Sequence, residues 1–162
     1  MKKILSGTVL CLLLLVLSGC VVGGKPSITA FLTAYDIEEI EIFRGGVPSQ
    51  AYRKIVTEQE DIERIINALN ALTIVREANS NDYIAGGMGI IFNFPLQNEH
   101  RLVVKNHGNL ITQISGWISD SPKVVYYIVD GTSLDTDEFW YSFNYEAVKV
   151  SENEFVASCG IY

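Results

Sequence analysis

The sequence predicts an α+β fold, in which one amphipathic helix packs on an antiparallel or mixed β-sheet. Residues 57–72 repeat hydrophobic side chains with helical spacing, whereas several shorter segments alternate or are rich in β-branched residues. The order of these segments is two strands, one helix and then further strands, which is typical of a sheet covered by a helix. The 162 residues suffice for one such domain, which we expect over residues 28–162.

Two strands are expected before the helix. Residues 39–42 alternate between glutamate and isoleucine, which is the pattern of a strand with one buried face. Residues 52–56 form a second extended segment, and Gly45, Gly46 and Pro48 favour a turn between the two. The chain is therefore expected to turn from the first strand into the second.

The helix is expected to begin near Thr57. Thr57 and Glu60 have the spacing of a capping box, in which the hydroxyl and the carboxylate bind free N–H groups of the first turn. Glu60 and Arg64 lie one turn apart, in the order that favours an ion pair.

The same helix has one hydrophobic face. Its members recur at helical spacing: Ile62, Ile65, Ile66, Leu69 and Leu72. Because Ile65 and Ile66 lie at the middle of this face, we expect both to be buried against the sheet.

Most of the remaining chain is expected to form strands. Ile90, Phe92 and Phe94 share one face of an extended segment that ends at Pro95. The other expected strands are residues 73–75, 102–105, 110–114 and 124–129.

The second half of the chain carries three further expectations. Residues 106–109 separate two strands and are expected to form the turn of a hairpin. Residues 124–129 are strongly hydrophobic, which favours a central position in the sheet. A second short helix, or else a strand, is expected over residues 134–145.

The N-terminus has the features of a secretory signal. Lys2 and Lys3 precede a short hydrophobic segment, residues 9–17, and Leu17-Ser18-Gly19-Cys20 places small residues before a cysteine. The last four residues resemble the lipobox of bacterial lipoproteins. That resemblance implies removal of residues 1–19 and attachment of a diacylglyceryl group to the thiol of Cys20. The alternative is an uncleaved membrane-spanning helix, although spanning takes about 20 consecutive apolar residues and polar residues interrupt this segment.

The resemblance also implies a location on the extracytoplasmic face of the cell membrane. Residues 20–27 would then comprise the lipidated cysteine and a short tether. The pattern of residues 37–129 is similar to small extracytoplasmic domains of unknown function in Gram-positive lipoproteins, a similarity that implies no activity. The lipid on Cys20 is therefore the expected contact with the membrane.

Charge and cysteine content limit the function classes. Without Lys2 and Lys3 the chain holds ten basic and nineteen acidic residues, so its net charge is near −9, which disfavours nucleic acid as a partner. Cys159 is then the only cysteine besides the lipidated one, so no intramolecular disulfide is expected.

His100 and His107 lack the spacing of a zinc site and are expected in solvated loops. Cys159 is expected to be a buried residue rather than a nucleophile.

An acidic segment near the second helix is the candidate metal site. Oxygen ligands of the kind that calcium prefers are Asp130, Asp135, Asp137 and Glu138. Their order does not match an EF-hand loop. The alternative is a turn at Asp130 followed by a helix start, where carboxylates are stabilised by the helix dipole. We expect no cofactor, with calcium as the alternative.

Aromatic residues are the candidate ligand contacts. They are dense between residues 139 and 145, and the residues singled out for a ligand surface are Trp117, Trp140 and Tyr141. The alternative is that these side chains complete the core.

The function expected from the sequence is that of a lipid-anchored accessory or binding domain without catalytic activity. Its partner would be a protein, a peptide or an envelope component. A hydrolase that acts on envelope material is the alternative, and it would need Asp82, Asp130 or Asp137 to converge in a cleft with one raised pKa. A calcium-binding surface domain is a further alternative.

Overall fold

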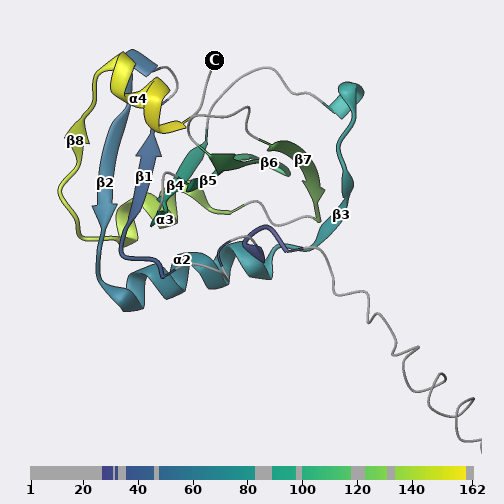
Figure 1. The fold of residues 1–162 in the computed structure, drawn as a ribbon, viewed down its shortest axis with the longest axis horizontal. Helices are drawn as coiled ribbons and strands as arrows, with labels where there is room; N and C mark the ends of the chain where they lie inside the picture. Colours follow the sequence, from purple (N-terminus) through teal and green to yellow (C-terminus); the bar gives the residue numbers. More distant parts are fainter. Residues whose placement is uncertain are drawn as a thin grey trace, which may run out of the picture.

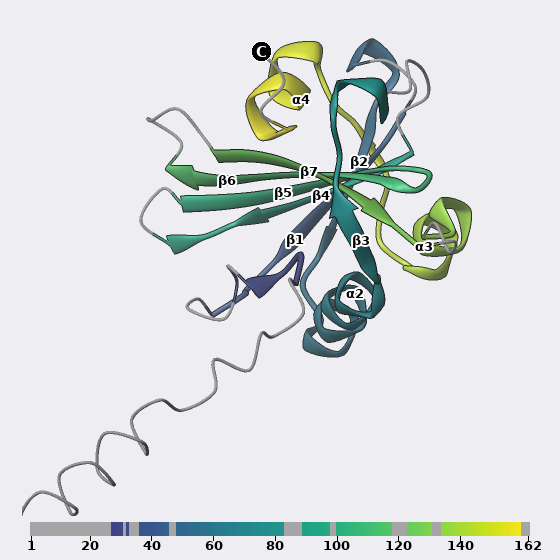
Figure 2. The same cartoon turned by 90° about the vertical axis from the view of Figure 1, so that its right-hand side faces the viewer.

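The computed structural model describes residues 27–30, 32, 36–45, 48–82, 89–97, 100–117, 123–130 and 134–159. Within these ranges, eight antiparallel strands form one sheet in the order β3-β7-β6-β5-β4-β1-β2-β8. Helices lie on both faces of the sheet (Figure 1, Figure 2). The predicted α+β fold is therefore confirmed. The signal segment, Cys20 and the tether up to Pro26 lie outside the described residues.

The secondary structure follows the chain as a series of short elements. The strands are β1 Ile40–Arg44, β2 Tyr52–Val56, β3 Ile74–Glu77, β4 Ile90–Pro95, β5 His100–His107, β6 Leu110–Trp117, β7 Lys123–Val129 and β8 Val148–Lys149. The helices are α2 Gln59–Ala71, α3 Thr136–Ser142 and α4 Glu152–Cys159, with 3-10 turns η2 Pro48–Gln50 and η3 Ser80–Asp82.

Helix α2 crosses one face of the sheet. It leaves β2 near one edge and leads into β3 at the other, so it runs across the strands (Figure 1). Ile62, Ile65 and Leu69 are buried beneath it, as the spacing predicts. Ile66 is only partly buried, because it lies toward one side of the helix.

The start of α2 differs from the prediction. The helix begins at Gln59, its N-cap is Glu58, and no side chain of the cap residue binds the first turn, so the capping box of Thr57 and Glu60 is absent. Instead, the Tyr145 hydroxyl accepts a bond from the Glu58 N–H at 3.2 Å and donates to the Asp61 carboxylate at 3.0 Å. A residue distant in sequence therefore accepts a hydrogen bond from a free backbone N–H at the start of the helix.

The expected pair of Glu60 and Arg64 is also not formed within the described part of the chain. The Arg64 guanidinium donates to the Ser142 hydroxyl at 2.9 Å and lies 4.8 Å from the centre of the Phe143 ring. Arg64 therefore connects α2 to the end of α3.

Two hydrophobic cores lie on opposite faces of the sheet. Ile42 belongs to the core under α2 and α3, together with Ile90, Phe92 and Phe94, whose shared face is thus confirmed. Phe43 and Ile91 point to the other face, where the Phe43 ring meets Phe155 of α4 edge to face at 5.6 Å. Figure 2 shows α4 on one side of the sheet and α2 with α3 on the other. The sequence pattern did not predict α4.

The later strands confirm one expectation and correct another. β5 and β6 form the predicted hairpin around Gly108, whose φ of 65° suits a glycine in a tight turn. Strand β7, however, is not central: it lies second from the β3 edge. Val124 and Tyr126 are each 42% exposed, because this part of the sheet is not enclosed on both faces.

Candidate functional site

A groove of about 390 Å³ lies near the β8 edge of the sheet. We call it the aromatic groove. Its lining comes from the end of β1, from η2, from the start of β2, from α3 and from the segment before β8: Arg44, Gly45, Gln50, Tyr52, Trp140 and Ala147.

One wall of the groove depends on a glycine. A Cβ atom on Gly45 would lie 2.8 Å from the Ala51 Cα and 3.0 Å from the Gln50 carbonyl oxygen. Real Cβ atoms do not approach backbone this closely, so only glycine lets the chain turn back here. The Gly45 turn thereby brings Gln50 and Tyr52 alongside Arg44.

The opposite wall depends on how α3 is held. The Asp135 carboxylate accepts bonds from the N–H groups of Asp137 and Glu138 at 3.0 and 2.9 Å, which caps the start of the helix. At the other end, the buried Lys54 ammonium donates to the carbonyl oxygens of Trp140 and Phe143, each at 2.7 Å. Burial lowers the pKa of Lys54. Both ends of α3 are thus fixed, and Trp140 is held in the groove.

Arg44 is the charged group of the groove. Its guanidinium forms an ion pair with Asp137 at 2.5 Å and lies 4.9 Å from the centre of the Tyr141 ring. Tyr141 is 71% exposed, so this ring extends the surface of the groove toward solvent. Trp140 is only 7% exposed and belongs to the core under α2 and α3, as the alternative predicts, and it also lines the groove with Tyr141 beside it. The side chain of Trp117 lies outside the described residues.

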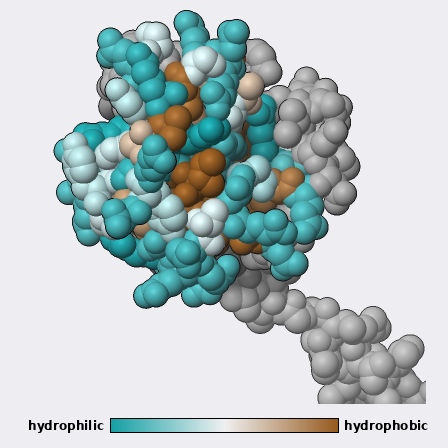
Figure 3. Space-filling view, turned by 90° about the vertical axis from the view of Figure 1, so that its left-hand side faces the viewer, coloured by the Kyte–Doolittle hydropathy of each residue, from teal (hydrophilic) through white to brown (hydrophobic). Residues whose placement is uncertain are grey.

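The groove combines aromatic faces with hydrogen-bonding groups. The described residues of its lining offer two rings, an amide and a guanidinium. Hydrophobic residues also gather on this side of the molecule, as Figure 3 shows, and the exposed ones include Ile55 of β2 and Val148 of β8. Exposed hydrophobic residues that gather beside a hollow are typical of contact surfaces.

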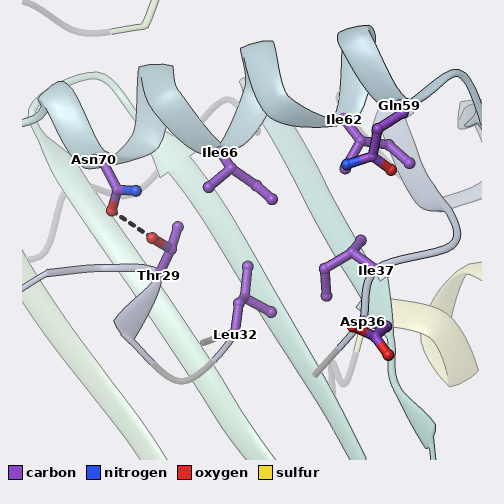
Figure 4. Close-up of a pocket in the computed structure, with 8 residues that line it drawn as sticks. All are labelled: Thr29, Leu32, Asp36, Ile37, Gln59, Ile62, Ile66 and Asn70. Carbon is purple, nitrogen blue, oxygen red and sulfur yellow. Dashed lines mark hydrogen bonds between the residues drawn. The ribbon is translucent and has the colours of Figure 1, made fainter. Parts of the chain in front are cut away.

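A second hollow, of about 380 Å³, lies between α2 and the N-terminal segment. Figure 4 shows Ile62 and Ile66 pointing from the helix toward Leu32 and Ile37. At its end the Thr29 hydroxyl donates to the Asn70 side chain (Figure 4). The Ser27 hydroxyl donates to the same Asn70 oxygen at 2.7 Å. These bonds fasten the beginning of the described chain to the C-terminal end of α2.

The candidate calcium ligands are not brought together. Asp135 serves as a helix cap and Asp137 pairs with Arg44, as the alternative reading of a helix start predicts. Asp130 follows β7, where its N–H donates to the Thr73 carbonyl oxygen at 2.9 Å. No group of three acidic, histidine or cysteine residues within the described ranges could hold a metal ion.

The carboxylates of the hydrolase alternative have other partners. Asp82 accepts two bonds from the Arg76 guanidinium, at 2.6 and 2.7 Å. This pairing lowers the pKa of Asp82 to about 2, which is the opposite of the raised pKa that a general acid needs. Asp137 lies with Arg44 at the start of α3, whereas Asp82 follows β3 at the far edge of the sheet.

Cys159 is a core residue, as the sequence predicts. It is fully buried in the core under α4, and burial raises the pKa of its thiol to about 12. A protonated thiol is a poor nucleophile. The expectation of loop histidines is wrong, because His100 and His107 are the first and last residues of strand β5.

Comparison with known proteins gives no relative from which a site could be transferred. No family model, curated protein or solved structure matches the chain. Among the residues that the structure describes, no helix is long and apolar enough to cross a membrane.

Proposed function

We propose that the chain is a lipid-anchored extracytoplasmic lipoprotein whose domain binds an envelope peptide or glycan through the aromatic groove. The observation that carries this proposal is the groove itself, with Trp140 and Tyr52 held beside Arg44. Its volume falls within the range of about 300–1,000 Å³ that ligand sites usually have. The proposed binding requires neither a catalytic group nor a cofactor.

The chemistry of the lining favours a ligand with flat hydrophobic faces and polar edges. The exposed rings of Tyr52 and Tyr141 can stack on a sugar ring or on a side chain of a peptide, whereas Trp140 is only 7% exposed and lines the groove from the core beneath it. Gln50 and Arg44 supply hydrogen-bond donors at the rim, and Arg44 is already oriented by Asp137 and Tyr141. Such prior orientation lowers the entropy lost on binding.

The position of the groove also supports the proposal. The chain enters the domain where Ser27 binds Asn70, near the C-terminal end of α2. The lining of the groove includes the end of β1 and the start of β2, near the β8 edge, and α2 leads from β2 across the sheet to β3 (Figure 1). Seven extended tether residues after Cys20 reach about 25 Å at most, so the domain would stay close to the membrane. With that attachment, the groove would lie at the end of the domain far from the tether.

Tryptophan fluorescence tests this proposal. Trp117→Phe leaves Trp140 as the only tryptophan, so its emission reports on the groove. Peptides and glycan oligomers released from the envelope are titrated into this variant, and a saturable change in emission is expected. Tyr52→Ala should weaken that binding about tenfold or more, since stacked rings contribute on the order of 1 kcal/mol beyond their buried area.

The matched control is Val75→Ala, which truncates an exposed hydrophobic residue of β3 at the opposite edge of the sheet. Binding should be unchanged in this variant. A ligand whose affinity is the same in Tyr52→Ala and in the parent would contradict the groove as the binding site.

A further inference from the structure

Two cations are buried on the face of the sheet that α4 covers only in part. Arg101 and Lys105 lie four residues apart on β5, so their side chains point to the same face. Val103 between them belongs to the core under α4, which identifies that face. Arg101 is only 6% exposed and Lys105 only 9%.

Neither cation has an anionic partner among the described residues. One terminal nitrogen of Arg101 donates to the Ala157 carbonyl oxygen at 2.7 Å, while its Nε is buried without a hydrogen-bond partner. Burial lowers the pKa of the Lys105 ammonium, and the charge of Arg101 lowers it further. Two buried positive charges without a counter-ion destabilise a fold.

The nearby acidic groups do not compensate for this charge. Glu41 lies on the same face, but its carboxylate accepts bonds from Arg53 at 2.9 Å and from Asn93 at 2.6 Å. Cys159, which lies close enough to interact with Lys105, keeps its proton because the pKa of its thiol is about 12. Among the residues that the structure describes, no acidic group therefore neutralises the charge of Arg101 and Lys105.

The strand register places further hydrogen-bond donors beside Lys105 and leaves Arg101 without a covering side chain on β6. Lys105 lies opposite Thr112 of β6, and Thr112 lies opposite Tyr126 of β7, so the three side chains form one row. Arg101 lies opposite Gly116, which has no side chain to cover the guanidinium. Tyr126 is 42% exposed, so this row of side chains reaches the solvent at β7.

We propose that Arg101, Lys105 and Thr112 bind a phosphate group, either as inorganic phosphate or as a phosphate monoester. A phosphate monoester carries a charge of about −1.5 to −2 at neutral pH, which matches two cations better than a single carboxylate does. The Nε–H of Arg101, the ammonium of Lys105 and the hydroxyl of Thr112 supply donors for its oxygens. This site is separate from the aromatic groove, so the two proposals can fail independently.

Isothermal titration calorimetry and thermal unfolding of the full chain in non-ionic detergent test the proposal. Inorganic phosphate, glycerol phosphate and acetate are compared at constant ionic strength. Saturable binding of inorganic phosphate alone identifies the free ion as the ligand, whereas equal binding of glycerol phosphate identifies a phosphate carried on a larger molecule. Acetate that binds as tightly as phosphate, or no binding of either phosphate compound, would overturn the assignment.

Three variants locate the site. Lys105→Met should lower phosphate affinity about tenfold or more, since hydrogen bonds to charged groups are the stronger kind, and should raise the melting temperature without phosphate. Thr112→Val keeps both charges and the shape of the side chain and should lower affinity several-fold. Lys123→Met, at an exposed lysine of β7, should change neither quantity. Unchanged phosphate affinity in both Lys105→Met and Thr112→Val would refute the site.

Discussion

The ammonium of Lys54 lies 2.7 Å from the carbonyl oxygen of Trp140, and this bond joins the sheet to the last turn of α3. A second bond of 2.7 Å reaches the Phe143 carbonyl oxygen, and the ammonium lies 4.9 Å from the centre of the Trp140 ring. A cation at the C-terminal end of a helix satisfies carbonyl oxygens that have no partner within the helix. Lys54 therefore holds the wall of the aromatic groove that Trp140 forms.

The first prediction concerns this contact. Lys54→Met should lower the free energy of unfolding by about 1–3 kcal/mol, because two carbonyl oxygens lose a charged donor in a buried place. Lys149→Met, at an exposed lysine of β8, should stay within about 0.5 kcal/mol. Urea unfolding of the domain from Lys25 onward measures both. Equal midpoints would show that the Lys54 contact does not stabilise α3.

The second prediction concerns the docking of α2. Ile65 is fully buried, so Ile65→Ala should cost about 2–5 kcal/mol through lost burial and the cavity left behind. Ile66→Ala should cost less, because Ile66 is only partly buried beside the hollow of Figure 4. Glu63→Ala, on the exposed face, should stay within about 0.5 kcal/mol. The same urea experiment ranks the three variants, and a loss for Glu63→Ala as large as for Ile65→Ala would contradict the packing.

The third prediction separates a helix cap from a metal ligand. Asp135→Ala should destabilise the domain by about 1 kcal/mol, because its carboxylate caps α3. The loss should be the same in calcium and in chelator. Calorimetric melting measures it, and a rise of several degrees at millimolar calcium in the parent would instead establish a calcium site.

The fourth prediction concerns pH. The bonds from Arg76 hold the pKa of Asp82 at about 2, below the ordinary value of 3.8. A carboxylate with a lowered pKa stabilises the fold above its ordinary pKa, and this contribution is lost as pH falls from about 4 through about 2. Carbon-13 NMR of the aspartate side chains measures the titration directly. Arg76→Ala should return the pKa of Asp82 toward 3.8, and an unchanged value would mean that the pair is not formed.

The sequence predicted those parts of the fold that depend on local pattern. The hydrophobic spacing of α2 and the hairpin around Gly108 were visible in short segments, whereas residues 134–145, which contain α3, were left open between a helix and a strand. Features that depend on distant partners were not visible. Tyr145 replaces the expected cap of α2 from 84 residues away, and α4 has no strong hydrophobic repeat because it presents only a short face to the sheet.

The candidate site was predicted only in part for the same reason. The aromatic density pointed to Trp140 and Tyr141, and the structure places both beside Arg44. Arg44 and Tyr52 were missed, because β1 and β2 meet α3 only through the tertiary fold. The sole local signal was the glycine pair that follows Arg44, which indicated a turn but not what the turn brings together.

The proposed function depends above all on the lipid anchor at Cys20, and metabolic labelling with a fatty-acid analogue tests this anchor most directly. The full chain expressed in bacteria should incorporate the label, because Cys20 holds the position of the cysteine that accepts the diacylglyceryl group in the lipoproteins that this signal resembles. Cys20→Ala should incorporate none and should retain its signal segment, while Cys159→Ala should be labelled like the parent. Label in the Cys20→Ala protein, or none in the parent, would contradict the proposal that this domain works from the membrane surface.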